Sequence, residues 1–311
     1  MGNNAIVTGG AGFIGSHLIE SIIDKFDKIY VIDNLIRTNG SLRNIENLRL
    51  NPKVKFLRGD VTNFDFDTIN DGISHLFHLA ATRINRCAQF NREGHDFIAS
   101  GGFNVVDFCA KNKIKMFFSS TASVYQKPKI LPIKEDVACV PHTIYGAAKL
   151  YTENLIRSYD NMYGMDYTIN RFFSVYGVRM DNAGAYTEVI FNWLNSIKNG
   201  NNTLTVQGNP DEKVLDLVYV SDVVNAILLT TFNSNKDVFN VSTMEGVTLT
   251  ELIDCIETIT NAELKVNITP EIRTDVELKR VGDISKLKDL GWERKVTLED
   301  GIRKVWNWIN E

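Results

Sequence analysis

The segment Thr143–Lys149 holds a tyrosine and a lysine, Tyr145 and Lys149, four positions apart. On a helix this spacing places both side chains on one face, one turn apart. A free tyrosine has a pKa of about 10, so it is a poor base at neutral pH. A lysine ammonium beside it would favour the phenolate, which could then take a proton from a sugar or alcohol hydroxyl. A surface tyrosine and lysine that merely share a helical face fit the same spacing, so the rest of the chain decides.

Three glycines follow a short apolar stretch near the N-terminus. Residues 4–8 read as a buried strand, Gly9, Gly12 and Gly15 come next, and residues 16–23 form an apolar helical stretch. Glycines at these positions allow a tight turn, close approach of backbone N–H groups to a pyrophosphate, and close packing of helix on strand. The segment therefore predicts a dinucleotide-binding turn.

A second predicted strand, residues 28–32, ends at Asp33, about 20 residues beyond the glycine-rich turn. A carboxylate there can accept hydrogen bonds from both hydroxyls of an adenosine ribose. The same charge would repel a 2′-phosphate, so the pattern favours NAD over NADP as the cofactor. A purely structural turn is the weaker interpretation once the strand, the helix and the acid are taken together.

Seven short motifs occur in one order along the chain, and together they resemble a known family. They are TGGAGFIG at 8–15, DN at 33–34, GDV at 59–61, HLAA at 78–81, SSTASVY at 119–125, YGAAK at 145–149 and RFFSVYG at 171–177. The chain resembles the extended short-chain dehydrogenase/reductases, in the branch of NAD-dependent nucleotide-sugar epimerases and dehydratases. It is most similar to UDP-glucose 4-epimerase-like enzymes, from about residue 4 to the C-terminus.

The resemblance implies a set of residues that bind NAD. They are Gly9, Gly12, Phe13, Ile14, Gly15, Asp33, Asn34, Asp60, Val61, Leu79, Ala80, Ala81, Ser119, Tyr145, Lys149 and Phe172. Within this set, Asp60 matches the acid that contacts the adenine amino group, although its residue type fits a helix cap or a turn equally well. Ala80 and Ala81 follow a predicted strand, where ligands bind in open α/β sheets. His78, just before them, is interpreted as a packed strand residue and not as a metal ligand.

The resemblance also implies the catalytic residues Thr121, Tyr145 and Lys149. In the family the Ser or Thr hydrogen-bonds the reacting hydroxyl and shares its proton with the tyrosine. Dehydratases of the family carry an Asp or Ser and then a Glu directly after this position, and this chain has Ala122 and Ser123. Neither side chain is a carboxylic acid, so elimination of water at the sugar is not expected.

Substrate contacts are less completely matched. The residues expected to bind the nucleotide sugar are Arg83, Thr121, Ser174, Val189, Thr205, Gln207 and Arg273. An Arg at position 273 would pair with a diphosphate through two parallel hydrogen bonds. Three positions depart from the family pattern: Ile98 and Ser174 stand where the family has Asn, and Leu215 stands where it commonly has Arg.

Alternating strand and helix patterns predict an α/β fold with a Rossmann-type, doubly wound parallel sheet and a smaller C-terminal α/β substrate domain. We expect residues 1–177 to form the NAD-binding domain, with returning segments at about 215–243. Residues 178–311 are expected mainly to bind the nucleotide sugar. A helix over 142–163 carries Tyr145 and Lys149, and the resemblance implies that this helix and one over 93–111 form the interface of a homodimer.

The composition of the chain argues against several classes of partner and site. The 311 residues carry a net charge of −4 and 44% hydrophobic residues, which is typical of a soluble globular protein and gives no reason to expect nucleic acid or a membrane as a partner. The four cysteines form no CxxC pair, so neither a zinc site nor a disulfide framework is predicted. The absence of a signal peptide and the expected free thiols favour the cytoplasm.

The sequence as a whole predicts an NAD-dependent nucleotide-sugar epimerase, acting at C4 of a UDP-hexose, in its plain or N-acetyl form, through a transient 4-keto intermediate. A nucleotide-sugar reductase and a UDP-uronic acid decarboxylase remain alternatives on the same fold. A non-catalytic NAD sensor is a third alternative, which the presence of Thr121, Tyr145 and Lys149 disfavours.

Overall fold

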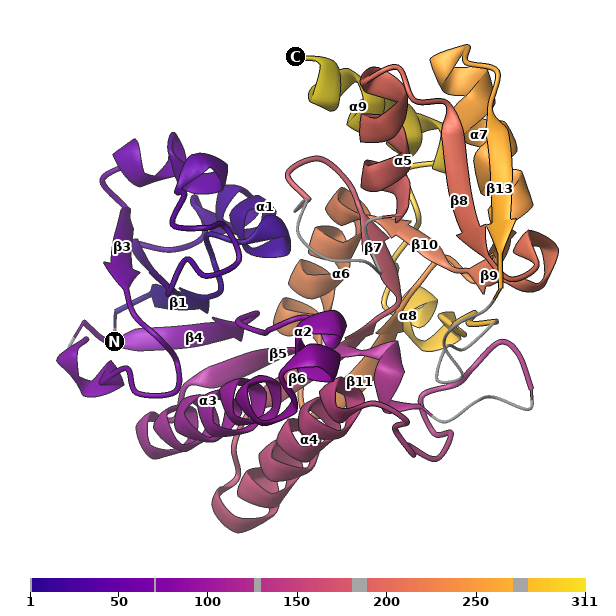
Figure 1. The fold of residues 1–311 in the computed structure, drawn as a ribbon. Helices are drawn as coiled ribbons and strands as arrows, with labels where there is room; N and C mark the ends of the chain where they lie inside the picture. Colours follow the sequence, from indigo (N-terminus) through magenta and orange to yellow (C-terminus); the bar gives the residue numbers. More distant parts are fainter. Residues whose placement is uncertain (1, 70, 126–129, 181–188, 271–278) are drawn as a thin grey trace. The chain divides into compact units, whose positions relative to one another are not determined.

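The computed structural model describes the chain except for residues 1, 70, 126–129, 181–188 and 271–278. It divides into two compact units (Figure 1). The first unit comprises residues 1–126, 138–171 and 224–239, and the second comprises 127–137, 172–223 and 240–311. Each unit is described by itself.

The first unit is built on a seven-stranded sheet with the strand order β11-β6-β5-β4-β1-β2-β3. The strands are β1 (Asn4–Thr8), β2 (Lys28–Asp33), β3 (Val54–Arg58), β4 (Ile73–His78), β5 (Lys115–Thr121), β6 (Tyr167–Phe172) and β11 (Asp237–Val241). The ladders of β1 with β2 and with β4 are parallel, and the strand order reverses at this point. Ligands of open α/β sheets bind beyond the carboxyl ends of the strands at such a reversal.

Helices cover both faces of this sheet (Figure 1). They are α1 (Phe13–Ile22), α2 (Ile84–Gln89), α3 (Asn91–Asn112), α4 (Ile144–Tyr163) and α6 (Val220–Asn233). On one face, Ile6 and Leu76 pack in a core with Val105 of α3 and Ile156 of α4. On the other face, side chains of β4 and β5 form an aromatic cluster with Phe26 and with Phe232 of α6, through Phe77 and Phe117. The predicted doubly wound α/β fold is therefore confirmed.

Strand β5 is longer than the sequence pattern indicates, since the apolar run predicts a strand over 115–118 and the structure continues it to Thr121. Ser119, Ser120 and Thr121 are all buried. Hydroxyl groups can be buried at little cost when each finds a hydrogen-bond partner. Ser119 donates to the carbonyl of His78 at 3.0 Å, and Ser120 donates to Glu153 at 2.5 Å. The buried hydroxyl groups of Ser119 and Ser120 thus have hydrogen-bond partners within the protein.

The second unit is also mixed α/β, with three small sheets. In the first sheet, β7 (Ser174–Tyr176) pairs in parallel with β10 (Leu217–Tyr219). In the second, β9 (Val214–Leu215) pairs antiparallel with β12 (Val247–Thr248). In the third, β8 (Thr203–Gln207) pairs in parallel with β13 (Lys265–Thr269). Its helices are α5 (Val189–Lys198), α7 (Leu249–Thr260), α8 (Ser285–Asp289) and α9 (Leu298–Asn310). Thr248 and Glu251 form a capping box that fixes the start of α7.

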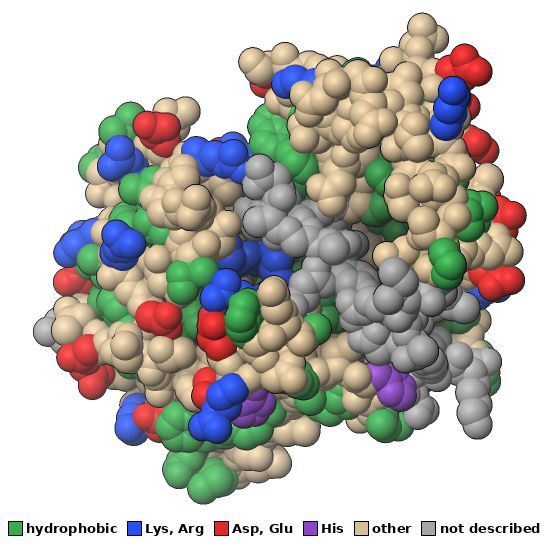
Figure 2. All heavy atoms as spheres, in the orientation of Figure 1, with side chains coloured by type: hydrophobic (Ala, Val, Ile, Leu, Met, Phe, Trp, Pro, Cys, Tyr) green, Lys and Arg blue, Asp and Glu red, His purple; other side chains and the backbone are tan. Residues whose placement is uncertain are grey.

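Short 3₁₀ turns complete the fold. They are η1 (Arg43–Ile45), η2 (Leu48–Leu50), η3 (Phe66–Thr68), η4 (Ala122–Val124) and η5 (Pro210–Glu212). The first two lie in the polar segment 34–52, for which the sequence predicts a loop with a short helix. Figure 2 shows acidic and basic side chains interspersed over the visible surface, in keeping with the small net charge. Within the described ranges, no helix combines the length and apolarity that a bilayer crossing requires.

Candidate active site

The glycine-rich turn joins β1 to α1 and touches the end of β4. Gly9 has a φ of +73°, and a Cβ there would lie 2.6 Å from the backbone nitrogen of Ala80. A left-handed backbone and so close an approach both require glycine. A Cβ on Gly15 would collide with the carbonyl oxygen of Gly9, whereas one on Gly12 would meet only that same oxygen, at 3.2 Å. The turn therefore needs Gly9 and Gly15 for its own packing and leaves one side of Gly12 open.

We expect Gly15→Ala to lower the free energy of unfolding of the cofactor-free protein by about 3 kcal/mol, because the added methyl group overpacks a backbone contact. Gly12→Ala, as a matched control in the same turn, should lower it by less than about 1 kcal/mol. Urea denaturation of both variants measures the difference. Equal stability of the two variants would show that the Gly9–Gly15 contact does not constrain the turn.

Asp33 ties the end of β2 to this turn. One carboxylate oxygen accepts from the backbone N–H of Ala11 at 3.1 Å, and the other accepts from that of Leu35 at 2.8 Å. Next to it, Asn34 donates to Asp60 at 2.8 Å. Asp60 also accepts from the backbone and hydroxyl of Thr62, at 2.9 and 2.7 Å. Asp60 thus holds a turn, which is the structural alternative considered for it.

The other predicted cofactor residues lie at or near the carboxyl ends of strands β1, β3, β4 and β6. Leu79 and Ala80 are buried and Ala81 is half-buried, directly after β4. Phe13 and Ile14 form the half-buried first turn of α1, Val61 is buried against Gly101 of α3, and Phe172, the last residue of β6, is buried. His78 is buried, and its ring nitrogen bonds the Thr8 hydroxyl at 2.7 Å. Burial, together with the nearby Lys149 ammonium, lowers the pKa of His78 to about 3, so the imidazole is neutral.

Thr121 and Tyr145 are brought together by the packing of α4 on the end of β5. The hydroxyl of Thr143 caps α4 by accepting from the N–H of Gly146 at 3.0 Å. A Cβ on Gly146 would collide with the carbonyl oxygen of Ser123, so the first turn of α4 lies directly on the turn after β5. In this arrangement the side chains of Thr121 and Tyr145 are hydrogen-bonded to each other.

The phenol of Tyr145 is protonated at neutral pH in the cofactor-free protein. Burial raises the pKa of Tyr145 to about 12, although the Arg37 guanidinium and the hydrogen bond with Thr121 act in the opposite direction. Cys87, Ile98 and Ala148 form a small apolar cluster against which Tyr145 packs. Ile98, which departs from the family pattern, therefore contributes an apolar wall beside the phenol and supplies no hydrogen bond through its side chain.

Lys149 lies one turn further along α4 and is almost completely buried. Its ammonium donates to the backbone carbonyl of Ser119 at 2.7 Å and lies 4.8 Å from the centre of the Phe118 ring. Burial, and next the Arg37 guanidinium, lower the pKa of Lys149 to about 7. The four-residue spacing predicts that this ammonium lies beside Tyr145, whereas its hydrogen bond in the structure is made to Ser119 of the neighbouring strand.

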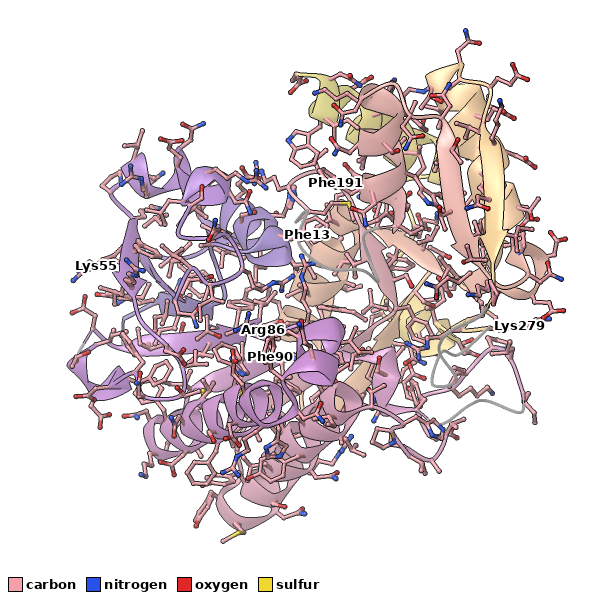
Figure 3. All side chains as sticks on the ribbon, in the orientation of Figure 1. Phe13, Lys55, Arg86, Phe90, Phe191 and Lys279 are labelled. Carbon is pink, nitrogen blue, oxygen red and sulfur yellow. The ribbon has the colours of Figure 1, made fainter. Side chains whose placement is uncertain are left out.

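The predicted substrate residues are distributed over both units. Arg83, in the first unit, is the N-cap residue of α2. Its neighbour in the same segment, Arg86, donates to Glu93 at 2.9 Å and lies over the ring of Phe90 (Figure 3). Arg86 is thereby engaged at the surface.

In the second unit, Ser174 begins β7, and its backbone N–H donates to the carbonyl of Asp216 at 3.0 Å. Val189 is the first residue of α5. Thr205 and Gln207 are exposed on the same side of β8. Arg273 lies outside the described residues.

Asp216 organises the segments next to β9 and β10. Its buried carboxylate accepts from the backbone of Thr243 at 2.6 Å, of Met244 at 3.2 Å and of Gly282 at 3.1 Å, and from the Thr243 hydroxyl at 2.7 Å. The backbone N–H of Arg280 donates to the carbonyl of Val214 at 3.2 Å. This places the Lys279–Gly282 segment, with two cationic residues, beside the strand that carries Leu215.

Two charged groups near Lys149 are not among the predicted site residues, although Arg171 begins the RFFSVYG motif. Glu153 is fully buried one turn after Lys149, and Arg171 is buried with it. The spacing of four residues from Lys149 was the signal that could have found Glu153, since it predicts a third polar residue on the catalytic face of the helix. Among the described residues, no cluster of three His, Cys, Asp or Glu side chains has the geometry of a metal site.

The sequence model of the family described as GDP-mannose 4,6 dehydratase matches residues 6–305. The chain belongs to this family. It is thus a member of the extended short-chain dehydrogenase/reductases of the nucleotide-sugar epimerase and dehydratase branch, as the motifs predict.

Relatives and solved structures agree with this assignment over almost the whole chain. The chain is 31% identical over 310 residues to the putative UDP-glucose 4-epimerase of Methanocaldococcus jannaschii, covering 98% of this chain and 97% of that one. The structure of the Thermotoga maritima UDP-glucose 4-epimerase with UDP-glucose is 30% identical, with a TM-score of 0.89 and coverage of 99% and 98%. The Thermus thermophilus UDP-glucose 4-epimerase in complex with NAD is 27% identical, with a TM-score of 0.89 and coverage of 99% of each chain.

Proposed function

We propose that this protein is an NAD-dependent 4-epimerase of UDP-linked hexoses. The observation that carries the proposal is the Thr121–Tyr145 hydrogen bond at the end of β5, with Lys149 one helical turn away. Ala122 and Ser123 follow Thr121 without a carboxylic acid, which argues against dehydration. Similar proteins are named as UDP-glucose 4-epimerases, and one of their structures is a complex with NAD, which supports 4-epimerisation, a UDP-linked substrate and NAD as the cofactor for this protein.

The residues of the first unit fit a dinucleotide. The turn at Gly9–Gly15 presents backbone at the N-terminus of α1, and Gly12 leaves the space that a side chain would fill. Ala80 and Ala81 keep the end of β4 free of bulky side chains. We propose that these residues, Asp33 and Lys149 hold NAD, which when bound supplies a reversible hydride acceptor for C4 of the sugar.

The chain's own groups then move the proton. Tyr145, in its phenolate form, takes the proton of the 4-hydroxyl, and Thr121 hydrogen-bonds that hydroxyl and shares the proton with the phenol. The resulting 4-keto sugar stays bound through its nucleotide diphosphate while it turns its other face. Tyr145 returns the proton when C4 is reduced again, so the reaction consumes no reductant. Retaining the keto intermediate supplies much of the rate, because both steps are intramolecular.

We further propose that the first unit binds the dinucleotide and the second unit mainly the nucleotide sugar. Arg83, Ser174, Val189, Thr205, Gln207 and Arg273 remain the proposed substrate contacts, and the position of Arg280 beside β9 adds it to them. Arg280 offers a cation near Leu215, where the family pattern commonly has an arginine.

The deciding assay incubates pure protein with UDP-galactose, UDP-N-acetylgalactosamine and UDP-glucuronic acid, without added reductant. A product with inverted C4 supports the proposal, and retained NAD should be released on denaturation. In a parallel assay with added NADH, its stoichiometric consumption would instead identify a reductase, and release of carbon dioxide from UDP-glucuronic acid would identify a decarboxylase. No inverted product from any sugar of the panel would contradict epimerisation.

We propose that the protein is a homodimer that pairs through α3 and α4. Gly102 of α3 packs directly on Thr152 of α4, and the adjacent Phe103 and Tyr151 are 43% and 44% exposed. Two such helices can form a self-complementary face in a two-fold dimer. The cytoplasm is the proposed location, since the spacing of the four cysteines predicts neither a zinc site nor a disulfide framework.

Phe103→Asp combined with Tyr151→Asp is expected to convert the dimer to a monomer, because two charges would be buried in an apolar interface. Sedimentation equilibrium should give twice the chain mass of 35.1 kDa for the wild type and a single chain mass for the variant. Leu50→Asp, at a residue 75% exposed elsewhere in the first unit, is the control and should stay dimeric. A monomeric wild type would refute the proposed assembly.

A further inference from the structure

A buried ion pair lies one helical turn beyond Lys149. Glu153 is 0% exposed and Arg171 is 2% exposed. Arg171 donates from Nε to one oxygen of Glu153 at 3.0 Å and from Nη2 to the other at 2.7 Å. The remaining nitrogen, Nη1, donates to the hydroxyl of the buried Tyr125 at 2.8 Å. The two parallel hydrogen bonds from Arg171 fix the carboxylate of Glu153 in one orientation.

The same carboxylate is bonded to the catalytic strand end. Ser120 donates to Glu153 at 2.5 Å, and Ser120 stands between the two residues of β5 that serve the site. On one side, the carbonyl of Ser119 accepts from Lys149, and on the other, Thr121 is hydrogen-bonded to Tyr145. Glu153 therefore holds α4 and β5 together at the point from which both proposed catalytic contacts are made.

Glu153 is ionised in this setting. Burial alone would raise the pKa of its carboxyl group, but the bonds from Arg171 and Ser120, with a smaller effect of Arg157, leave the pKa below its usual range. Arg157 is partly exposed and donates to Glu153 at 3.1 Å. The buried anion is thus stabilised mainly by Arg171.

The groups that face Lys149 differ in charge. Arg37, in the segment after β2, is a cation that disfavours a second positive charge. His78 of β4 is neutral, and burial raises the pKa of Cys87 of α2 to about 11, so this thiol is also neutral at pH 7. Tyr145 on α4 is protonated. Of these neighbours in the described part of the chain, Glu153 supplies the ionised acid.

We propose that Glu153, clamped by Arg171, is a positioning residue of the reaction, which keeps Lys149 in its charged form and holds the Ser119–Thr121 strand end against α4. The inference rests on the proposed function, because it concerns the same site. Structural stabilisation alone is a poor explanation for the pair, since a buried ion pair is often no more stabilising than apolar residues of similar size.

The first test measures the charge of Lys149 directly, in cofactor-free protein. In protein labelled with ¹³C-lysine, the Cε signal of Lys149, assigned by its loss in Lys149→Arg, is titrated by NMR. Glu153→Gln should lower the pKa of Lys149 by about one unit, because the carboxylate is one helical turn away in a buried site. Arg157→Gln, which alters a partly exposed partner of the same carboxylate, is the matched control and should shift that pKa by less than about 0.3 units.

The second test follows the pH profile of kcat for the NAD-loaded enzyme. Activity should rise with pH as Tyr145 ionises and level off once Lys149 loses its proton, so Glu153→Gln should move this bend in the profile to lower pH by about one unit. At pH values above the bend the variant should be about ten-fold slower than wild type. Arg157→Gln should follow the wild-type profile.

If Glu153→Gln fails to fold, the double variant Glu153→Leu, Arg171→Met takes its place. Both charges of the pair are then removed, so neither buried ion is left without its partner. A folded double variant with a lowered pKa of Lys149 and a bend displaced to lower pH supports the inference. Wild-type values of both quantities in either folded variant would overturn it and leave a purely structural role. An inactive wild type would refute the proposed function instead, while the NMR titration would still decide the role of Glu153.

Discussion

Replacing Tyr145 by phenylalanine is expected to reduce kcat by about 10²–10⁴-fold, the usual contribution of a positioned acid–base group. The phenol oxygen is the only atom removed, and its hydrogen-bond partner Thr121 lies on a strand whose other contacts remain. The fold and the binding of NAD should therefore persist. Steady-state kinetics with UDP-galactose, together with the amount of NAD retained by the purified variant, measure both expectations.

Tyr159→Phe is the matched control for this change. Its hydroxyl bonds Asp107 at 3.2 Å at the far end of the same helix, so its loss should leave kcat within about two-fold of wild type. Full activity of Tyr145→Phe would exclude the phenol as the base and with it the epimerase mechanism. If the wild type also lacked activity while both proteins bound NAD, the sensor hypothesis would be favoured.

The pH dependence follows from the same residue. Burial raises the pKa of Tyr145 to about 12 in the cofactor-free protein, so the phenolate is scarce at pH 8 and its fraction grows ten-fold per pH unit. The rate should accordingly rise with pH up to the pKa of Lys149, about 7, and level off above it, where the growing phenolate fraction is offset by the loss of the ammonium. Loss of the rising limb in Tyr145→Phe would tie that limb to the phenol.

The second large effect is expected from Lys149→Met, which replaces a buried ammonium by an uncharged chain of similar length. We expect kcat to fall by about 10²-fold or more, because the charge proposed to favour the phenolate and a proposed contact with NAD are both removed. The affinity for NAD should fall as well, as measured by calorimetric titration. Undiminished activity and affinity would show that Lys149 serves only the packing of α4.

The same substitution should change how stability depends on pH. The pKa of Lys149 is lowered by burial to about 7 in the folded protein, against about 10.4 when unfolded. Its burial therefore costs stability fully below pH 7, on the order of 4 kcal/mol, and progressively less as pH rises toward the unfolded value. Lys149→Met removes this cost but leaves the Ser119 carbonyl without its donor, which offsets part of the gain.

The free energy of unfolding of Lys149→Met minus that of wild type should thus be largest at pH 6.5 and should shrink by pH 9.5. Urea denaturation at several pH values gives this difference. Lys111→Met, at an exposed lysine, should show a nearly constant difference over the same range. A constant difference for Lys149→Met would mean that the buried amine titrates in the folded protein as it does in the unfolded chain.

The parts of the site that depend on local sequence were predictable. Gly9 and Gly15 are required by a single tight turn, Asp33 follows directly from the end of a strand, and Tyr145 and Lys149 share a helix. Each of these features is set by residues close together in the chain, so motif and periodicity suffice. The resemblance to a family supplied Thr121, which is distant in sequence from Tyr145 but hydrogen-bonded to it.

The contacts that decide charge were not predictable, because they join distant segments. The ammonium of Lys149 bonds the carbonyl of Ser119, thirty residues earlier, and Glu153 meets Arg171 from another strand. Neither hydrophobic pattern nor residue type indicates which buried acid pairs with which base. The extension of β5 through Thr121 was missed for the same reason, since its hydroxyls are satisfied by residues that only the folded chain brings near.

The carboxylate of Asp216 has a consequence for altering the sugar range of this protein. One side chain fastens the backbone at Thr243, Met244 and Gly282, so these segments are fixed to a common anchor. A shift of either loop would leave the buried carboxylate of Asp216 without its hydrogen-bond donors. Engineering of substrate preference should therefore exchange side chains at Lys279 and Arg280 and leave the loop lengths unaltered.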